Sequence, residues 1–174
     1  IMPPSGWTLE KPGASASEFV ANNMNSASTN FTSVDPTSTS SALVQHDASN
    51  VIDTWLKSPA YSITSADAYL EFYTLYRGTS ISGGILSVYI STDGVDWSSE
   101  VWTNGPNNTD DNTLRWYKNT VDLAAYDGQD IYLGFRYYGQ GGYFAGFDGV
   151  KIAAYTGVND PITINVGDSV SPKE

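Results

Sequence analysis

The side chains that could carry out chemistry in this chain are mostly acidic. The sequence contains 19 Asp and Glu residues, one histidine and no cysteine. Serine nucleophiles commonly depend on an imidazole base, and the single imidazole, His46, ends a predicted strand in a chain that has no G-x-S-x-G motif. Without cysteine there is no thiolate nucleophile, disulfide or thiolate metal site. These observations disfavour a serine or cysteine hydrolase.

Glycoside hydrolysis is the acid chemistry to weigh next. It needs two carboxylates about 5 to 9.5 Å apart, one of them with a raised pKa. Nineteen acids would supply some such pair by chance, but no E-x-D-x-E pattern places acids along one strand face. Glu71 is the only acid inside a strongly predicted central strand, and we expect Arg77 or Arg136 to neutralise it across the sheet. A polysaccharide-active enzyme is therefore an alternative interpretation and not the first one.

Aromatic residues point to a different activity, the recognition of sugars. The chain has 12 Tyr, 6 Phe and 5 Trp residues. Aromatic rings stack on the apolar faces of pyranose rings, while nearby amides and carboxylates bond the hydroxyl groups. The candidates that flank the polar loop Asn104–Asn112 or the glycine-rich turn Gly139–Gly142 are Trp97, Trp102, Tyr138, Tyr143 and Phe144. We assign three other aromatics, Trp55, Phe72 and Trp116, to packing.

Charge and composition exclude several partners. Eight Lys and Arg residues stand against 19 Asp and Glu, so the formal net charge is −11. This balance disfavours nucleic acids and anionic membrane surfaces, both of which bind cationic surfaces. No apolar stretch is long enough to span a bilayer. Abundant Ser, Thr, Asn, Gly and Tyr with little Lys favour a secreted or cell-surface location. The start, Ile1–Pro4, has no signal-like pattern, and we expect a piece of a longer chain.

The elements that must position these residues are β-strands. Polar and apolar residues alternate with period two between Gly, Pro, Asn and Asp clusters, and helical periodicity is nearly absent. The clearest strand begins at Ile85, and its residues Leu86, Val88 and Ile90 share one face. Two further strongly predicted strands are Ala68–Arg77 and Ile131–Tyr138. Further strands are predicted over Gly6–Glu10, Ala42–His46, Thr54–Lys57, Glu100–Thr103, Leu114–Val121 and Phe147–Ala154. The sequence thus predicts an all-β fold, a two-sheet antiparallel β-sandwich of jelly-roll type.

The domain boundaries follow from the same pattern. Residues 1–156 form one predicted domain, which at this length needs no cross-link for stability. The segment Lys11–Asp35 is expected to be a long loop with room for one short edge strand. After the predicted domain, residues 157–174 are expected to be a linker or the start of a following module, with one possible strand at Ile162–Val166.

Several motifs occur in the order found in one known family. They are Pro4–Thr8, Trp55-Leu56-Lys57-Ser58-Pro59, Leu70–Tyr73, Val88-Tyr89-Ile90-Ser91-Thr92-Asp93-Gly94, Trp116, Thr120–Gln129, Leu133–Tyr137 and Phe147–Ile152. This set resembles the cleaved adhesin family, the haemagglutinin-type modules of gingipain proteases, and the related choice-of-anchor J domains. The resemblance covers about residues 4 to 153.

The resemblance implies a jelly roll akin to galactose-binding and MAM domains. Such modules are usually accessory parts of larger secreted or surface-anchored bacterial proteins, and the implied function is non-catalytic binding of carbohydrate or of a host or matrix protein. A monomeric module within a multidomain chain is expected. A purely structural spacer beside a protease domain is the remaining alternative.

A structural calcium ion is also implied by the resemblance. In similar jelly rolls an acid near the last strand meets acids or carbonyls that follow the first strand, which points here to Asp148 with Glu18 and Asp53 as metal ligands. The chain departs from the family pattern at two places. Lys11–Glu18 replaces a run of aspartates and glycines, and Gly149 stands where the family has a second aspartate.

Overall fold

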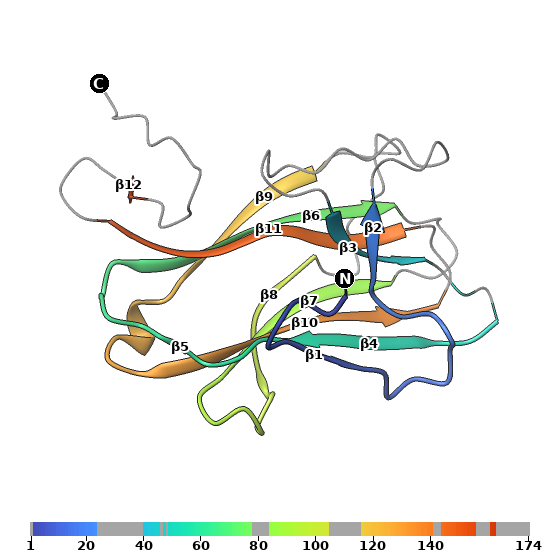
Figure 1. Ribbon diagram of the computed structural model, residues 1–174, viewed down its shortest axis with the longest axis horizontal. Helices are drawn as coiled ribbons and strands as arrows, with labels where there is room; N and C mark the ends of the chain where they lie inside the picture. The colour runs from blue at the N-terminus through green and yellow to red at the C-terminus, as the bar shows by residue number, and fades with distance from the viewer. Residues whose placement is uncertain are drawn as a thin grey trace.

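The fold is built almost entirely from antiparallel strands in two facing layers (Figure 1). The computed structural model describes residues 2–23, 40–45, 47, 49–77, 84–104, 116–140, 144–155 and 161–162. Within these residues each sheet has six strands. No helix of the described part has the length and apolar character needed to cross a membrane.

The first sheet is the lower layer in Figure 1 and carries the candidate site described below. Its main path runs in the order β1 (Thr8–Glu10), β4 (Ile52–Lys57), β10 (Asp130–Gly139), β7 (Ile85–Ser91) and β8 (Ser99–Thr103). The short β5 (Tyr61–Ser62) pairs with the start of β10. A register shift between Val88 and Tyr89 interrupts the pairing of β7 with β8.

The second sheet is the upper layer in Figure 1 and, like the first, has a main path of five strands with one short strand paired beside it. Its order is β2 (Val20–Asn23), β3 (Ser40–Gln45), β11 (Phe144–Tyr155), β6 (Ala68–Arg77) and β9 (Trp116–Asp122), with β12 (Pro161–Ile162) paired to the end of β11. A single 3-10 turn, η1 (Ala124–Tyr126), follows β9. All pairings in both sheets are antiparallel, which confirms the predicted jelly-roll sandwich.

The core lies between the sheets and is formed by the alternating apolar residues. Phe72 from the second sheet meets Phe135 from the first edge to face, at 6.0 Å between ring centroids. Phe135 lies 4.9 Å from Phe147 in the same manner. The face predicted for β7 is confirmed, because Leu86, Val88 and Ile90 are buried. The following residues of β6 and β10 are buried with them: Leu70, Phe72, Ile131, Leu133, Phe135 and Tyr137. One continuous apolar layer therefore holds the two sheets together.

The strand predictions agree with the structure in type and differ mainly at the ends. The edge strand expected within Lys11–Asp35 is β2. Sequence analysis missed β5, because two residues are too short to display an alternation. The predicted strand Ile162–Val166 overlaps β12 by one residue, and positions 156–160 and 163–174 lie outside the described residues. The division at 156 therefore stays a prediction.

Glu71 lies on the outer face of the second sheet, where its partners differ from those expected. Only 3% of it is exposed, and it forms ion pairs with Lys118 and, at 2.8 Å, with Lys151. The β6–β11 register sets Lys151 directly opposite Glu71. Arg136, proposed above as a partner, belongs to the other sheet, and the side chain of Arg77 lies outside the described set. The prediction of an arginine partner is corrected to two lysines.

Tyr137 makes stability sensitive to alkaline pH. Its side chain is 3% exposed, and burial raises the pKa of its phenol above the ordinary value near 10, with a smaller contribution from Tyr76. The unfolded chain ionises first, so the stability due to the neutral phenol is complete below pH about 10 and falls as the pH rises further. We expect Tyr137→Phe to flatten this alkaline loss. Urea unfolding between pH 8 and pH 11 measures it, and parallel curves for both proteins would contradict the assignment.

Candidate functional site

The outer face of the first sheet gathers aromatic and charged side chains. Along β4 the residues Asp53, Trp55 and Lys57 are half-buried while their neighbours in sequence are buried. On β10, Arg136 pairs with Trp55 and Gly134 pairs with Lys57. We call the set Asp53, Trp55, Lys57, Tyr89, Trp97, Arg136 and Tyr138 the outer aromatic face. Period-two alternation on three neighbouring strands, together with the loop described next, brings these residues to one surface.

Trp97 reaches this face from the loop between β7 and β8. Asp93 organises the loop, since one of its carboxylate oxygens accepts backbone N–H groups from Val95 and Asp96, each at 2.8 Å. The Ser91 hydroxyl donates to the same oxygen at 2.9 Å and accepts the Gly94 N–H, also at 2.9 Å. These hydrogen bonds, those from Asp96 and Val95 first, lower the pKa of Asp93. The loop is therefore held in shape without any contribution from a ligand.

The Trp97 indole packs directly on Gly134, which has no side chain to occupy that position. A Cβ atom at Gly134 would come within 2.7 and 2.8 Å of two Trp97 ring carbons and within 3.3 Å of Trp55. The Trp97 ring meets Trp55 edge to face at 6.1 Å, and Trp55 in turn lies 4.9 Å from Tyr89. Three aromatic rings thus form a contiguous cluster over the centre of the sheet.

Adding a methyl group at Gly134 tests this arrangement. We expect Gly134→Ala to displace the Trp97 ring, shift its fluorescence to longer wavelength and lower the free energy of unfolding by about 1 to 3 kcal/mol. In a Trp97→Ala background most of that cost should vanish, because the clashing ring is gone. Chemical denaturation of the four proteins in this cycle measures the coupling. Additive effects of the two substitutions would contradict the contact.

Charged side chains interleave with the rings of the face. The Arg136 guanidinium lies 4.9 Å from the Trp55 ring and 4.8 Å from the Tyr138 ring. Asp53 holds it with two hydrogen bonds of 2.8 Å each, and this pairing raises the pKa of Arg136. Bidentate arginine–carboxylate pairs of this kind fix the orientation of both groups. Arg136 is therefore held between two rings by its acid partner.

A second cation is held in the same way. The Lys57 ammonium lies 4.9 Å from the Trp97 ring and 5.4 Å from Trp55, and it donates to Glu10 at 2.6 Å. On the other side of the cluster the Tyr89 hydroxyl donates to Glu100 at 3.3 Å. Ordered hydroxyl, carboxylate and cationic groups thus surround the rings, which is the combination that bonds sugar hydroxyls.

The predicted ligand-binding aromatics are divided among different regions. Trp97 and Tyr138 both lie on the outer aromatic face, where Tyr138 is 46% exposed. Trp102 turns inward and meets Phe72 edge to face at 5.2 Å. Phe144 packs against a small cluster of Leu43 and Leu75 in the second sheet. Tyr143 lies outside the described residues. The structure therefore brings two of the five candidates together.

Trp55 was assigned to packing but lies on the outer aromatic face, as do Lys57, Tyr89 and Arg136, which were not predicted as ligand-binding residues. The available signal was the alternation of β4, in which Ile52, Thr54 and Leu56 are buried and Trp55 shares the opposite face with two charged residues. The other two packing assignments agree with the structure. Phe72 is fully buried, and Trp116 packs on the Leu43–Leu75 cluster.

The predicted calcium ligands do not come together. Both Asp53 oxygens bond Arg136, Glu18 pairs with Lys11 at 3.6 Å, and Asp148 accepts the Gly149 N–H at a β-bulge in β11. Among the described residues there is no group of three or more His, Cys, Asp or Glu side chains that could hold a metal ion. This ligand set does not fit calcium, and calcium binding itself stays a prediction.

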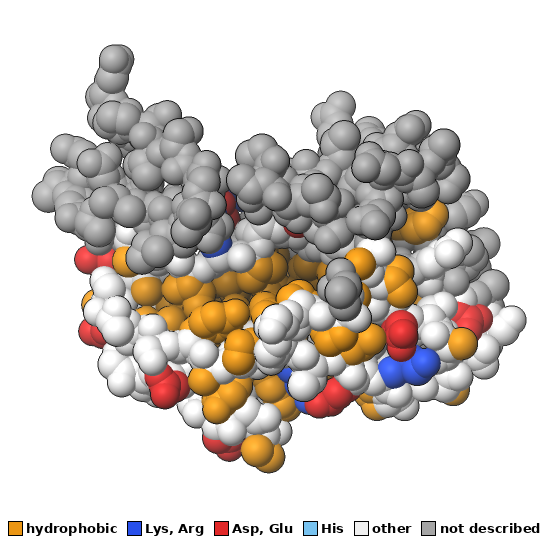
Figure 2. Space-filling model, in the orientation of Figure 1, with side chains coloured by type: hydrophobic (Ala, Val, Ile, Leu, Met, Phe, Trp, Pro, Cys, Tyr) orange, Lys and Arg blue, Asp and Glu red, His pale blue; other side chains and the backbone are white. Residues whose placement is uncertain are grey.

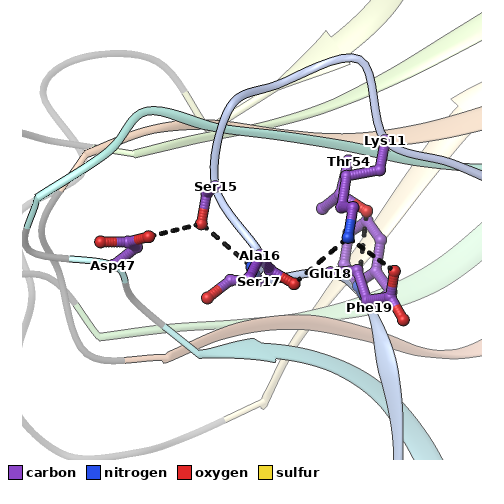
Figure 3. A network of polar contacts seen from close by, with 8 residues as sticks. All are labelled: Lys11, Ser15, Ala16, Ser17, Glu18, Phe19, Asp47 and Thr54. Atoms are coloured by element: carbon purple, nitrogen blue, oxygen red, sulfur yellow. Dashed lines mark hydrogen bonds and ion pairs between the residues drawn. The ribbon is translucent and has the colours of Figure 1, made fainter.

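The segment that contains Glu18 has a structural role in the described part of the chain (Figure 3). The buried Ser15 hydroxyl donates to Asp47 at 2.7 Å and accepts the Ser17 N–H at 3.0 Å. The Ser15 bond and further ones from Ser49 and Asn50 lower the pKa of Asp47 to about 2. These contacts fasten the connection between β1 and β2 to the loop before β4.

A separate hollow opens between the two sheets beside the N-terminal segment. Figure 2 shows hydrophobic side chains in a band between the layers at this place. The hollow has a volume of about 320 Å³, and its lining includes Trp7, Tyr61, Phe135 and Phe147. This hollow is distinct from the outer aromatic face, because none of its lining residues belongs to that face.

Comparison with solved structures identifies the architecture. The K1 cleaved adhesin domain of Lys-gingipain from Porphyromonas gingivalis W83 superposes with a TM-score of 0.62 at 19% identity, over 87% of this chain and 92% of that chain. The chain has the fold of a cleaved adhesin domain. Neither a protein-family model nor a curated protein sequence matches it.

Two further solved structures resemble this chain at lower similarity. TmCBM61, solved in complex with β-1,4-galactotriose, matches with a TM-score of 0.53 at 16% identity, over 86% of this chain and 89% of that chain. The Endo-D glycoside hydrolase domain from Streptococcus pneumoniae R6 matches with a TM-score of 0.52 at 11% identity. Here the alignment covers 89% of this chain but 25% of the other.

Proposed function

We propose that the protein is a non-catalytic carbohydrate-binding and adhesion module that binds its ligand on the outer aromatic face. The observation that carries this proposal is Trp97, which an internally hydrogen-bonded loop holds on Gly134 beside Trp55. An indole fixed before binding loses little conformational entropy when a sugar stacks on it. Tyr138 offers a second, exposed ring on the same surface.

Two comparisons support this proposal. The neighbouring fold in Lys-gingipain is an adhesin domain, and TmCBM61 has a bound galactotriose. A secreted or cell-surface location, and a monomeric module within a larger chain, accord with the adhesin comparison. A host or matrix protein is the alternative ligand for an adhesin of this fold.

A polysaccharide-active enzyme is the competing function, and a glycoside hydrolase domain is among the similar folds. The acids of the outer aromatic face argue against it here. Asp53 uses both oxygens on Arg136, Glu10 is paired with Lys57, and Glu100 accepts the Tyr89 hydroxyl. Each carboxylate is therefore already engaged by a partner, whereas a general acid must be free to deliver a proton to the leaving group.

One experiment separates the functions. The purified protein is tested for binding to immobilised plant, bacterial and host glycans and matrix proteins, and the same glycans are assayed for new reducing ends. We expect retention on at least one glycan without product formation. Reducing ends that appear with wild-type protein but not with Glu71→Gln would instead support the enzyme. A protein that binds none of these ligands would support the spacer.

Calcium is part of the proposed function and has its own test. If an ion supports the domain, EDTA should lower the thermal midpoint in calcium-free buffer, and added calcium should restore it. Magnesium serves as the control, because it demands a tighter octahedral site. An unchanged midpoint would remove calcium from the proposal while leaving the aromatic face intact, because Asp53, the one residue of that face among the predicted calcium ligands, is held by Arg136 through both of its oxygens.

A further inference from the structure

We infer that the ligand of the outer aromatic face is an uncharged, extended oligosaccharide and not an acidic glycan. This inference rests on the proposed function and adds the substrate class. It follows from how the charges on the face are paired and from the distance along β10 between Gly134, on which Trp97 rests, and the exposed Tyr138.

The charges of the face are internally compensated. Within and around it the described residues include two cations, Lys57 and Arg136, and three acids, Glu10, Asp53 and Glu100. Each cation is bonded to an acid, at 2.6 Å for Lys57 and 2.8 Å for Arg136. A carboxylate or sulfate on a glycan would meet cations whose charge is already compensated. Displacing one of these acids would only exchange one charge pair for another.

The burial of these pairs increases the cost of exchange. The side chain of Asp53 is 15% exposed, so this acid, once displaced from Arg136, would remain in a poorly hydrated position, whereas Glu10 beside Lys57 is 51% exposed. Removing one member of such a pair leaves the other charge uncompensated. The net charge of −11 adds a general repulsion toward polyanions. Neutral hydroxyl groups face neither penalty, because they can bond the exposed edges of pairs that stay intact.

The geometry also points to a chain longer than a single sugar. Trp97 rests on Gly134, and Tyr138 lies four residues further along the same strand. At about 3.3 Å per residue, the two positions are separated by roughly 13 Å along β10. Arg136 lies between these positions, and its partner Asp53 pairs in register with Tyr138. Two stacking platforms with polar groups between them suit consecutive sugar units that follow the strand.

The test compares a neutral and an acidic 1,4-linked polysaccharide built from galactose or its uronic acid, with salt dependence used to separate the effect of charge from that of linkage. Isothermal titration measures binding of β-1,4-galactan fragments of two to six units and of polygalacturonate fragments, at 50 mM and 500 mM salt. We expect wild-type affinity for the neutral series to rise with length and to be unchanged by salt, and polygalacturonate to bind more weakly. A preference for polygalacturonate that salt abolishes would overturn the inference while leaving sugar binding intact. Absence of binding to every glycan would instead remove the proposed function.

Two matched variants make the charge argument decisive. Asp53→Asn and Asp67→Asn each remove one negative charge, but only the first releases Arg136, because Asp67 lies in the exposed turn before β6. We expect Asp53→Asn to strengthen polygalacturonate binding by about fivefold or more, and Asp67→Asn to leave it unchanged. Equal behaviour of the two variants would overturn the inference. Circular dichroism verifies that Asp53→Asn remains folded.

Discussion

Replacing Phe135 with alanine is expected to cost about 3 to 5 kcal/mol of folding free energy, a large part of the stability of a domain of this size. The ring is 1% exposed and contacts aromatic rings from three directions: Trp7 at 5.8 Å, Phe72 at 6.0 Å and Phe147 at 4.9 Å. These partners belong to both layers, so the cavity would open where the sheets meet.

Guanidinium denaturation of Phe135→Ala, followed by circular dichroism, provides the measurement. Phe135→Leu is the matched control, because it keeps most of the apolar volume and should lose less stability. A loss below about 1 kcal/mol for the alanine variant would mean that the sheets do not share this interior. It would also remove the basis for placing the outer aromatic face on a rigid support.

Replacing Trp97 with alanine is expected to weaken glycan binding by about 30-fold or more, which corresponds to about 2 kcal/mol for the loss of a central aromatic anchor. Stability should change less than in Phe135→Ala, since Trp97 comes from a loop and lies on the outside of the sheet. Titration against the glycan retained by the wild-type protein measures the effect.

Tyr117→Ala is the control for this substitution. Tyr117 is 50% exposed and lies on β9 of the other sheet, so its loss removes an exposed aromatic ring without altering the proposed face. Equal weakening by both variants would indicate a non-specific contribution of exposed rings. Full binding by Trp97→Ala would exclude the outer aromatic face as the glycan site.

Much of the fold was predictable because burial imposes a strict pattern on strands. Leu86, Val88 and Ile90 alternate with polar neighbours, and this alternation fixes both the strand and its inner face. The same rule failed for β5, which is too short to repeat. It also failed to reveal the partners of Glu71, because the identity of neighbouring strands depends on sheet order and not on the local sequence.

The candidate site was predictable only in part, for a related reason. Trp97 and Trp102 are five residues apart and looked equivalent, yet the first lies on the outer face and the second packs against Phe72. Part of a loop and a register shift lie between the two residues. Neither a loop nor a register shift leaves a repeating pattern in the sequence, so the two orientations could not be predicted. The calcium ligands failed similarly, because Asp53 acquires its arginine partner from a strand 83 residues away.

The edge strands of the first sheet affect how readily this sheet pairs with a strand of another molecule at high protein concentration. One edge strand, β1, has three residues, and the other, β8, pairs out of step with β7 at Val88 and Tyr89. Short or irregular edges are poor templates for strand addition by another chain. Copies of the domain at high local concentration are therefore not expected to form intermolecular sheets through the edges of this sheet.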